Sequence, residues 1–220
     1  MQEHGTEAVV EWLIGGMPTA TTAEEVMGQL CARLTACGLP LWRVSVFVRT
    51  LHPHLMGRRF TWRPDTPVEV AGAPYETLAS DDYLRSPVVR VYDSGMSLRR
   101  RLADPACPID FPVLEDFRRD GVTDYVVAPL RFTNGEIHVA TFSTRAPGGF
   151  TERHIAGLDA IVAPLARIAE ILSLRRLGGT LLDTYVGRHA GARILAGQIR
   201  RGDTEAIDAA IWLSDMRGFT

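Results

Sequence analysis

The sequence contains no lysine, so all 24 of its basic residues are arginines. Chemistry that depends on a lysine side chain, such as a Schiff base or the lysine of a phosphate-binding P-loop, is therefore excluded from these 220 residues. Cysteine is also scarce, and Cys31, Cys37 and Cys107 have neither CxxC nor metal-ligand spacing. Three scattered thiols predict reduced side chains in a cytoplasmic protein without disulfides.

Long apolar runs and an excess of one charge are missing as well. No run of about 18 apolar residues could span a bilayer, and the N-terminus lacks a basic segment followed by an apolar stretch. We therefore expect no membrane contact in this segment. The net charge of -2 gives no reason to expect binding to nucleic acid. The length of 220 residues suffices for one domain of about 150 residues and an appendage.

Hydrophobic periodicity predicts helices and strands in a mixed order. A short helix over 8–14 and a capped helix from Thr21 precede an alternating run over 41–50, which is typical of a half-buried strand. In that strand we expect one face to carry Trp42, Val44, Val46 and Val48. Further short strands are expected over 58–63, 67–70 and 96–101, with loops elsewhere in 74–112.

The clearest local signal is a β-hairpin. A short helix over 111–121 precedes two β-rich runs, 125–132 and 136–144, which flank Asn134-Gly135. Asn-Gly supplies the positive φ angles of a tight hairpin turn.

A long helix is expected from Thr151 onward. Proline removes a backbone donor, so Pro164 is expected to kink this helix. The pair Gly178-Gly179 is expected to interrupt it, and the helix is expected to resume at Leu181.

The order of these elements predicts an α+β fold, an antiparallel sheet flanked by helices with a long C-terminal signalling helix. It resembles a GAF domain over residues 20–172, and a PAS-like domain is the nearest alternative. The Asn-Lys-Phe-Asp-Glu set of cyclic-nucleotide-binding GAF domains cannot be completed without lysine. Cys107 lies in Pro-Ala-Cys-Pro and lacks the histidine that commonly follows the chromophore cysteine of bilin-binding relatives. The ligand, small molecule or protein, stays unidentified.

The long helix carries an apolar heptad repeat. Such an a/d seam suits pairing with a second copy of the chain, and the alternative is a helix packed on its own domain's sheet. The residues of the expected dimer seam are Leu158, Ile161, Leu165, Ile168 and Leu172.

Two other features favour structural roles over ligand binding. His138 on the second hairpin strand is expected to be a surface or hydrogen-bonded histidine. The runs Arg99–Arg101 and Arg118–Arg119 are expected to be solvated or paired with carboxylates.

The end of the chain carries a more specific resemblance. Tyr185-Val186-Gly187, then Ile194-Leu195-Ala196-Gly197 and Arg200-Arg201-Gly202, are similar to the helical transducer of class III adenylate/guanylate cyclases. Ala209 to Phe219 resembles the first strand of their catalytic domain and the turn that follows it.

The same segment makes chemical sense as part of a nucleotide site. A strand over Ala210–Leu213 would deliver Asp215 at its end, and Gly218 would let backbone amides approach phosphate oxygens. Magnesium prefers a carboxylate or two together with substrate phosphates. The resemblance implies that Asp215 is the first of two metal-binding aspartates. It also implies that the turn near the triphosphate consists of Met216, Arg217, Gly218, Phe219 and Thr220.

In such enzymes the second aspartate and the remaining catalytic groups lie further downstream. We therefore expect this chain to be inactive by itself, to contain no catalytic residue and to need no cofactor. The longer protein would convert ATP to cyclic AMP and pyrophosphate with Mg or Mn, as a homodimer through the C-terminal helix. The alternatives are a guanylate cyclase, or a GAF-like protein-interaction domain without a small ligand.

The expected organisation has four parts. They are an N-terminal helical segment (1–19), a GAF-like regulatory domain (20–172), a signalling helix with the transducer region (173–208), and the start of a catalytic domain (209–220).

Overall fold

A computed structural model describes residues 5–17, 19–50, 54–200, 210, 212 and 213. The chain divides into two compact units, Met1–Leu177 and Gly178–Thr220. In order, the elements are α1 (Gly5–Ile14), α2 (Ala23–Ala36), β1 (Arg43–Arg49), β2 (Leu55–Trp62), β3 (Glu69–Pro74), the 3-10 helix η1 (Tyr75–Ala79), α3 (Asp81–Leu84), α4 (Pro87–Ser94), β4 (Leu98–Arg100), α5 (Val113–Arg119), β5 (Asp124–Arg131), β6 (Ile137–Thr144), α6 (Glu152–Val186) and α7 (Arg188–Leu195).

The strands form one antiparallel sheet, which confirms the predicted fold class. Its order is β3-β2-β1-β6-β5-β4, and each neighbouring pair is antiparallel. The predicted hairpin joins β5 to β6 with Leu130 opposite His138. Gly135 in its turn has a φ of 87°, a value that glycine adopts without steric cost.

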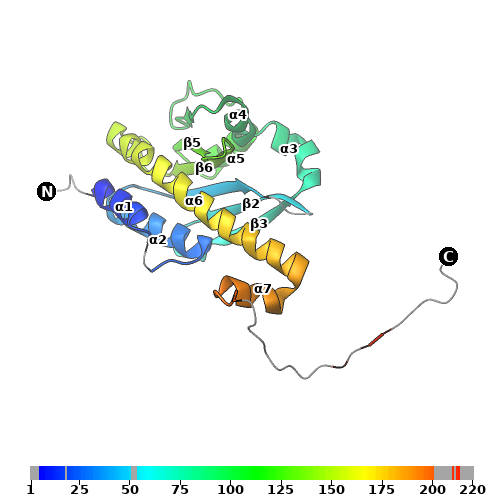
Figure 1. The fold of residues 1–220 in the computed structure, drawn as a ribbon. Coiled ribbons are helices and arrows are strands. Elements are labelled where there is room, and N and C mark those ends of the chain that lie inside the picture. The colour runs from blue at the N-terminus through cyan, green and yellow to red at the C-terminus, as the bar shows by residue number, and fades with distance from the viewer. Residues whose placement is uncertain (1–4, 18, 51–53, 201–209, 211, 214–220) are drawn as a thin grey trace. The chain divides into compact units, whose positions relative to one another are not determined.

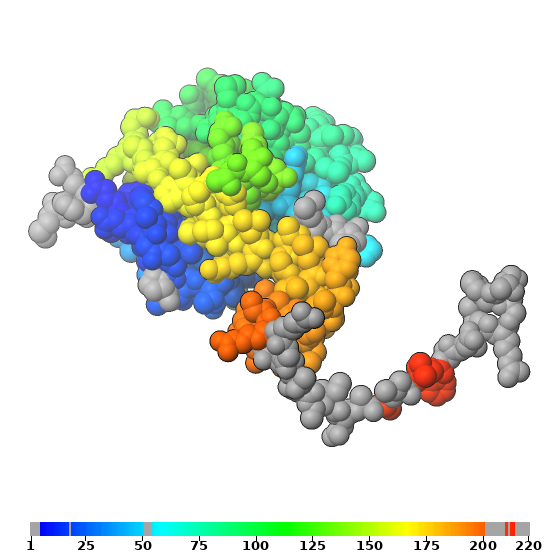
Figure 2. Space-filling view, in the orientation of Figure 1, coloured from blue at the N-terminus to red at the C-terminus, as the bar shows by residue number. Residues whose placement is uncertain are grey.

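Alternation along the strands creates two hydrophobic cores. Val44, Val46 and Phe142 point to one face of the sheet and pack with residues of α1, α2 and α6, which we call the first core. Val127 and Val139 point to the other face and pack with residues of α4 and α5, which we call the second core. Figure 1 shows α1, α2 and α6 together on one side of the sheet. In Figure 2 the blue α1–α2 segment and the yellow α6 segment adjoin on the surface.

The expected faces of the first strand need one correction. Val44, Val46 and Val48 belong to the first core, but Trp42 packs against the second core, beneath the Arg145 guanidinium at 4.0 Å from the ring centre. Trp42 precedes the first residue of β1, so the alternation of the strand does not yet apply to it.

The expectation of loops between 74 and 112 was also wrong in part. The predicted short strand is present as β4, but the segment before it contains η1, α3 and α4. The Ser86 hydroxyl caps α4 by accepting from the Val89 N–H at 3.2 Å, and Pro87 occupies the first turn. Helices this short leave too few apolar repeats to be distinguished from loops.

The start of α2 follows its predicted capping chemistry. The Thr22 hydroxyl accepts from the Glu25 N–H at 3.2 Å, while Glu25 Oε2 accepts from the Thr22 N–H at 3.2 Å and the Thr21 N–H at 2.7 Å. These hydrogen bonds lower the pKa of the Glu25 carboxyl, with the Thr21 N–H as the largest cause.

The helix α6 runs without interruption from Glu152 to Val186. Pro164 lies inside it, and so do Gly178 and Gly179, so the expected break at the glycine pair was wrong. No helix in the described residues is long and apolar enough to cross a membrane.

A buried ion pair fixes the chain just before α6. Arg99 Nη2 lies 2.8 Å from Asp124 Oδ2, with the Asp124 side chain fully buried and that of Arg99 23% exposed. The same arginine donates to the Phe150 carbonyl at 2.6 Å, and Asp124 accepts from the Phe150 N–H at 3.0 Å. Gly149 has a φ of 77°, and a Cβ there would lie 2.7 Å from the Asp124 Cβ. The pair therefore ties β4 and β5 to the segment that enters α6.

Candidate functional site

A cavity of about 600 Å³ lies on the side of the sheet that carries the second core. Residues of β1, β2 and β3 form one wall, and residues of η1, α3, α4 and α5 form the other. This volume falls within the range of small-molecule pockets, about 300–1,000 Å³. The segment over 75–94, expected to be loop, thus contributes helices that cover a cavity.

Five arginines line this cavity, which we call the arginine pocket: Arg43, Arg49, Arg58, Arg59 and Arg85. Asp82 and Asp116 also line it. Arg43 and Arg49 project from β1 on the same face because they are an even number of positions apart, and Arg59 lies opposite Phe47 on β2. Burial lowers the pKa of Arg43, and the nearby Arg63 lowers it further. The Arg59 Nε is buried without a hydrogen-bond partner. Arg43 and Arg59 are half-buried and Arg49 is exposed, and Arg59 Nη2 already pairs with Glu69 at 3.3 Å. The unpartnered Arg59 Nε is therefore the donor that favours an anionic group in the pocket.

Aromatic side chains complete the walls of the arginine pocket. The Arg49 guanidinium lies 4.2 Å from the centre of the Tyr92 ring, and that of Arg43 lies 5.5 Å from the Phe117 ring. Burial raises the pKa of Tyr92 and of Tyr125 above its ordinary value of 10.0. Both phenols therefore stay protonated at neutral pH and keep an O–H to donate. The lining suits a ligand that combines an anionic group with planar or apolar surface.

A hydrogen bond connects the backbone of a pocket arginine to the helix side of the sheet. The Arg49 N–H donates to His138 Nδ1 at 3.0 Å, and the His138 ring lies 3.8 Å from that of Phe132. His138 is buried, so it is the hydrogen-bonded histidine of the prediction and not a surface residue. Burial lowers its pKa, while the charge of Glu136 opposes that shift. The histidine is neutral at pH 7 and able to accept from Arg49.

Glu170 of α6 anchors the helix to the hairpin turn. Its carboxylate oxygens accept from the Thr133 N–H at 2.9 and 3.1 Å and from the Thr133 hydroxyl, and Arg167 Nη1 lies 2.6 Å from Oε2. The Thr133 hydroxyl is the largest cause of the lowered pKa of Glu170, and the charge interaction with His138 also lowers it. A hydrogen bond joins Arg49 to His138, and an interaction of charges relates His138 to Glu170, so these three residues form a series from the arginine pocket to α6.

Acid should weaken this anchor. The pKa of Glu170 in the folded protein lies below its ordinary value of 4.5, so its contribution to stability is complete above that value and is lost as pH falls through the folded pKa. We expect Glu170→Gln to unfold at a lower temperature than the unchanged chain at pH 7, with the difference shrinking toward about pH 3. Thermal unfolding followed by circular dichroism across this range measures it. The exposed Glu115→Gln is the control, and a difference independent of pH would contradict the assignment.

The residues of the predicted dimer seam pack in the core of their own domain. Leu158, Ile161, Leu165 and Ile168 are at most 7% exposed and belong to the first core, and Leu172 packs against it. This is the alternative arrangement, in which the helix packs on its own sheet. These side chains are therefore engaged within one chain.

The predicted nucleotide segment falls largely outside the described residues. Asp215, Met216, Arg217, Gly218, Phe219 and Thr220 are all outside them. Of the expected strand, Ala210, Trp212 and Leu213 are described, and they are exposed and outside regular secondary structure. Across the described ranges, no group of three or more His, Cys, Asp or Glu side chains could hold a metal ion.

Solved structures of low sequence identity share the fold. A phycocyanobilin-bound GAF domain from a cyanobacterial phytochrome matches 77% of this chain and 96% of its own length, with 18% identity and a TM-score of 0.53. A GAF domain of A. aeolicus in an inactive state matches 78% of this chain and 99% of its own, with 12% identity and a TM-score of 0.53. The chain has the fold of a GAF domain. A GAF domain from a phosphoenolpyruvate-protein phosphotransferase of Coxiella burnetii gives 13% identity over 79% and 96% of the two chains, with a TM-score of 0.52. No protein-family model and no curated protein matches the chain.

The arginine pocket of this GAF-like domain could not be identified from sequence spacing. Arg43 and Arg49 on β1 are separated from Arg59 by the turn into β2, and their partners Tyr92 and Phe117 are further away still. The available signal was the placement of arginines on the strand face opposite the valines, where Arg43 is half-buried and Arg49 exposed. Cys107 lies outside this set, and burial raises the pKa of its thiol above the ordinary value of 9.0.

Proposed function

We propose that this chain is the regulatory part of a class III nucleotide cyclase, in which the GAF domain binds a small anionic ligand and α6 passes the signal toward a catalytic domain. The observation that carries the proposal is the sequence from Tyr185 onward, which resembles the transducer and opening catalytic strand of such enzymes. The longer protein would convert ATP to cyclic AMP and pyrophosphate. Conversion of GTP is the alternative, because base-selecting residues lie downstream in this family.

The arginine pocket supports ligand sensing over a purely protein-binding role. A protein-interaction domain has no need of an internal cavity, whereas about 600 Å³ lined by arginines and phenols suits a small molecule. The series from Arg49 through His138 to Glu170 supports coupling of that pocket to α6. If these three residues have two arrangements, a ligand that binds one arrangement more tightly would shift α6 toward the state that goes with it.

Pairing of two chains through α6 is part of the proposal, but along a different stripe from the predicted seam. Ile171, Leu174, Leu181 and Tyr185 are between 44% and 82% exposed. Together with Gly178 they are spaced by three and four residues alternately, which is the a/d pattern of a coiled coil. The buried repeat and this exposed stripe are offset by one residue, so they occupy neighbouring faces of the helix.

In the longer enzyme, Asp215 would be one of the carboxylates that hold Mg or Mn, and the residues from Met216 to Thr220 would lie near the triphosphate. In this family the second metal-binding aspartate lies further downstream than the segment that Asp215 resembles. We therefore assign no catalytic residue within residues 1–220.

The test joins the chain to the catalytic segment that follows it in its reading frame. Cyclase activity of this longer protein is expected to change several-fold when a small-molecule filtrate of the host cells is added. Ala71→Trp, which fills the arginine pocket, is expected to abolish that response, while Thr66→Trp in the exposed turn before β3 keeps it. The chain alone, incubated with ATP and Mn²⁺, is expected to give no cyclic nucleotide. Product from the chain alone, or a longer protein without cyclase activity, would refute the proposal.

A further inference from the structure

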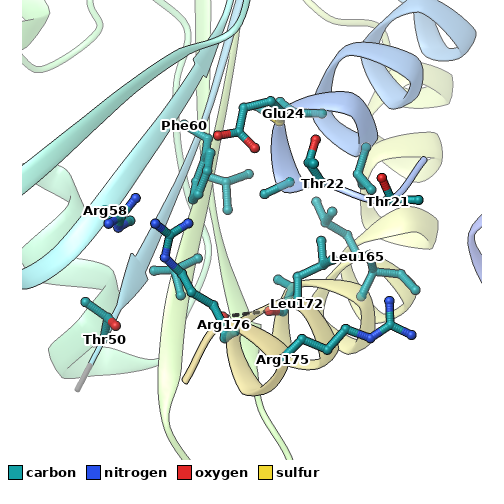
Figure 3. A pocket seen from close by; sticks show the side chains of 18 residues that line it. Thr21, Thr22, Glu24, Thr50, Arg58, Phe60, Leu165, Leu172, Arg175 and Arg176 are labelled. Carbon is teal, nitrogen blue, oxygen red and sulfur yellow. Dashed lines mark hydrogen bonds between the residues drawn. The ribbon is translucent and has the colours of Figure 1, made fainter. Parts of the chain in front are cut away.

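A second cavity, of about 460 Å³, lies on the opposite side of the sheet from the arginine pocket. It is enclosed by residues of α2, β1, β2 and α6, and we call it the α2–α6 pocket (Figure 3). Its volume again falls within the range of small-molecule sites, about 300–1,000 Å³. Neither the predicted nucleotide site nor the arginine pocket includes it.

The floor of the α2–α6 pocket is aliphatic. Buried side chains of the first core line it, among them Val46, Val48, Leu165 and Ile168. These side chains carry no hydrogen-bonding group, so the lower part of the pocket favours an alkyl chain over a polar or charged group. Phe60 of β2 closes one side.

Two arginines from different elements meet at the same pocket. Arg58 projects from β2 and Arg176 from α6, and Figure 3 shows their guanidinium groups near one another while that of Arg175 points away. Burial lowers the pKa of Arg58, and the charge of Arg176 lowers it further, as expected for like charges held close together.

The charge of this arginine pair is not balanced by an ion pair. Among the described residues, no carboxylate lies within 4.0 Å of either guanidinium. Glu24 of α2 also lines the pocket, and its charge acts on Arg58 in the opposite direction to Arg176, but less strongly. The two adjacent guanidinium groups above an apolar floor would therefore stabilise an anion bound between them.

We propose that the α2–α6 pocket binds an amphipathic monoanion, a medium-chain fatty carboxylate, with its alkyl chain on the aliphatic floor and its carboxylate between Arg58 and Arg176. The α2–α6 pocket shares Val48 and Arg58 with the lining of the arginine pocket but opens on the other face of the sheet, and the proposal does not depend on the cyclase assignment. Because Leu165, Ile168 and Arg176 all belong to α6, the bound molecule touches the helix directly, immediately before the exposed stripe continues toward Tyr185.

Decanoate is the probe, and isothermal titration calorimetry of the purified chain is the measurement. Decanoate is expected to bind, and decanol and acetate to bind at least tenfold more weakly, since one lacks the charge and the other the chain. Arg58→Gln and Arg176→Gln are each expected to weaken decanoate binding about tenfold or more, which is the effect of losing a charge-assisted hydrogen bond. Glu24→Gln is expected to strengthen it about threefold, because a competing negative charge is removed.

Two further variants locate the site. Ala169→Phe fills the α2–α6 pocket from α6 and is expected to abolish binding, and Ser173→Phe does the same nearer the arginines if the first variant unfolds. Ala71→Trp in the arginine pocket is expected to leave decanoate binding unchanged. Equal binding of decanol and decanoate, unchanged affinity in both arginine variants, or loss of binding in Ala71→Trp would each overturn the proposal.

Discussion

Replacing Arg99 by glutamine is expected to lower the free energy of unfolding by about 3–5 kcal/mol, the usual cost of removing one partner from a buried ion pair. Asp124 would keep a fully buried carboxylate with only the Phe150 N–H as a polar partner. The Phe150 carbonyl would lose its donor at the same time. Urea denaturation followed by tryptophan fluorescence measures the difference.

The neighbouring residue provides a matched control on the same strand. Arg100 pairs with Asp110, whose side chain is 41% exposed, so Arg100→Gln is expected to cost about 1 kcal/mol or less. Equal losses of unfolding free energy in the two variants would show that the burial of Asp124 does not determine how much its ion pair stabilises the fold.

The second large effect concerns association of two chains. In Leu174→Glu/Leu181→Glu, charges replace two leucines of the exposed stripe, and each dimer would contain four of them. We expect the dissociation constant of the dimer to rise at least about 100-fold, because the apolar contact between the two exposed stripes is lost and like charges face one another. Analytical ultracentrifugation over a range of chain concentrations measures it.

Changes elsewhere on α6 distinguish this stripe from a general effect on the helix. Asp159→Asn, at an exposed position within the same helix, is expected to leave the dissociation constant unchanged. A monomeric chain at high concentration, or a dimer unaffected by the two glutamates, would refute pairing through the stripe. Circular dichroism of these variants is the control, and it is expected to show unchanged helix content.

Most of the sheet could be predicted from the sequence because the apolar alternation of a strand is visible within a few consecutive residues. The valines of β1 and the Asn-Gly turn between β5 and β6 each act within a few residues. The helices before β4 were missed because α3 and α4 are too short to show an apolar repeat, although Ser80 and Ser86 are the N-caps that could have indicated their starts. The run of arginines at 99–101 was expected to be either solvated or paired with carboxylates, and Arg99 and Arg100 are paired. The partners Asp124 and Asp110 were not identifiable, since they are reached only through the fold.

The site was harder to predict than the fold. Heptad spacing in α6 was recognised, but spacing alone does not say whether an apolar stripe meets a sheet or another helix, and Leu158 and Ile161 meet the sheet. The arginine pocket combines β1 and β2 with α4 and α5, so no local pattern contains it. Glu170 lies on a helix and Thr133 in a turn, and their contact depends on how the helix crosses the hairpin.

The glycine pair inside α6 gives this helix an uneven resistance to melting. Each glycine disfavours the helical state by about 1 kcal/mol relative to alanine, and Gly178 and Gly179 are consecutive in the stretch that follows Leu177. Before this point, α6 is stabilised by its burial in the first core. Beyond it, the helical turns are supported by α7, whose Gly191 lies against Leu182 and Asp183, and by whatever packs against the exposed stripe. In the proposed function, a signal from the domain would then be transmitted as a change in helix length, with turns wound or unwound after Leu177, as well as by a rigid displacement.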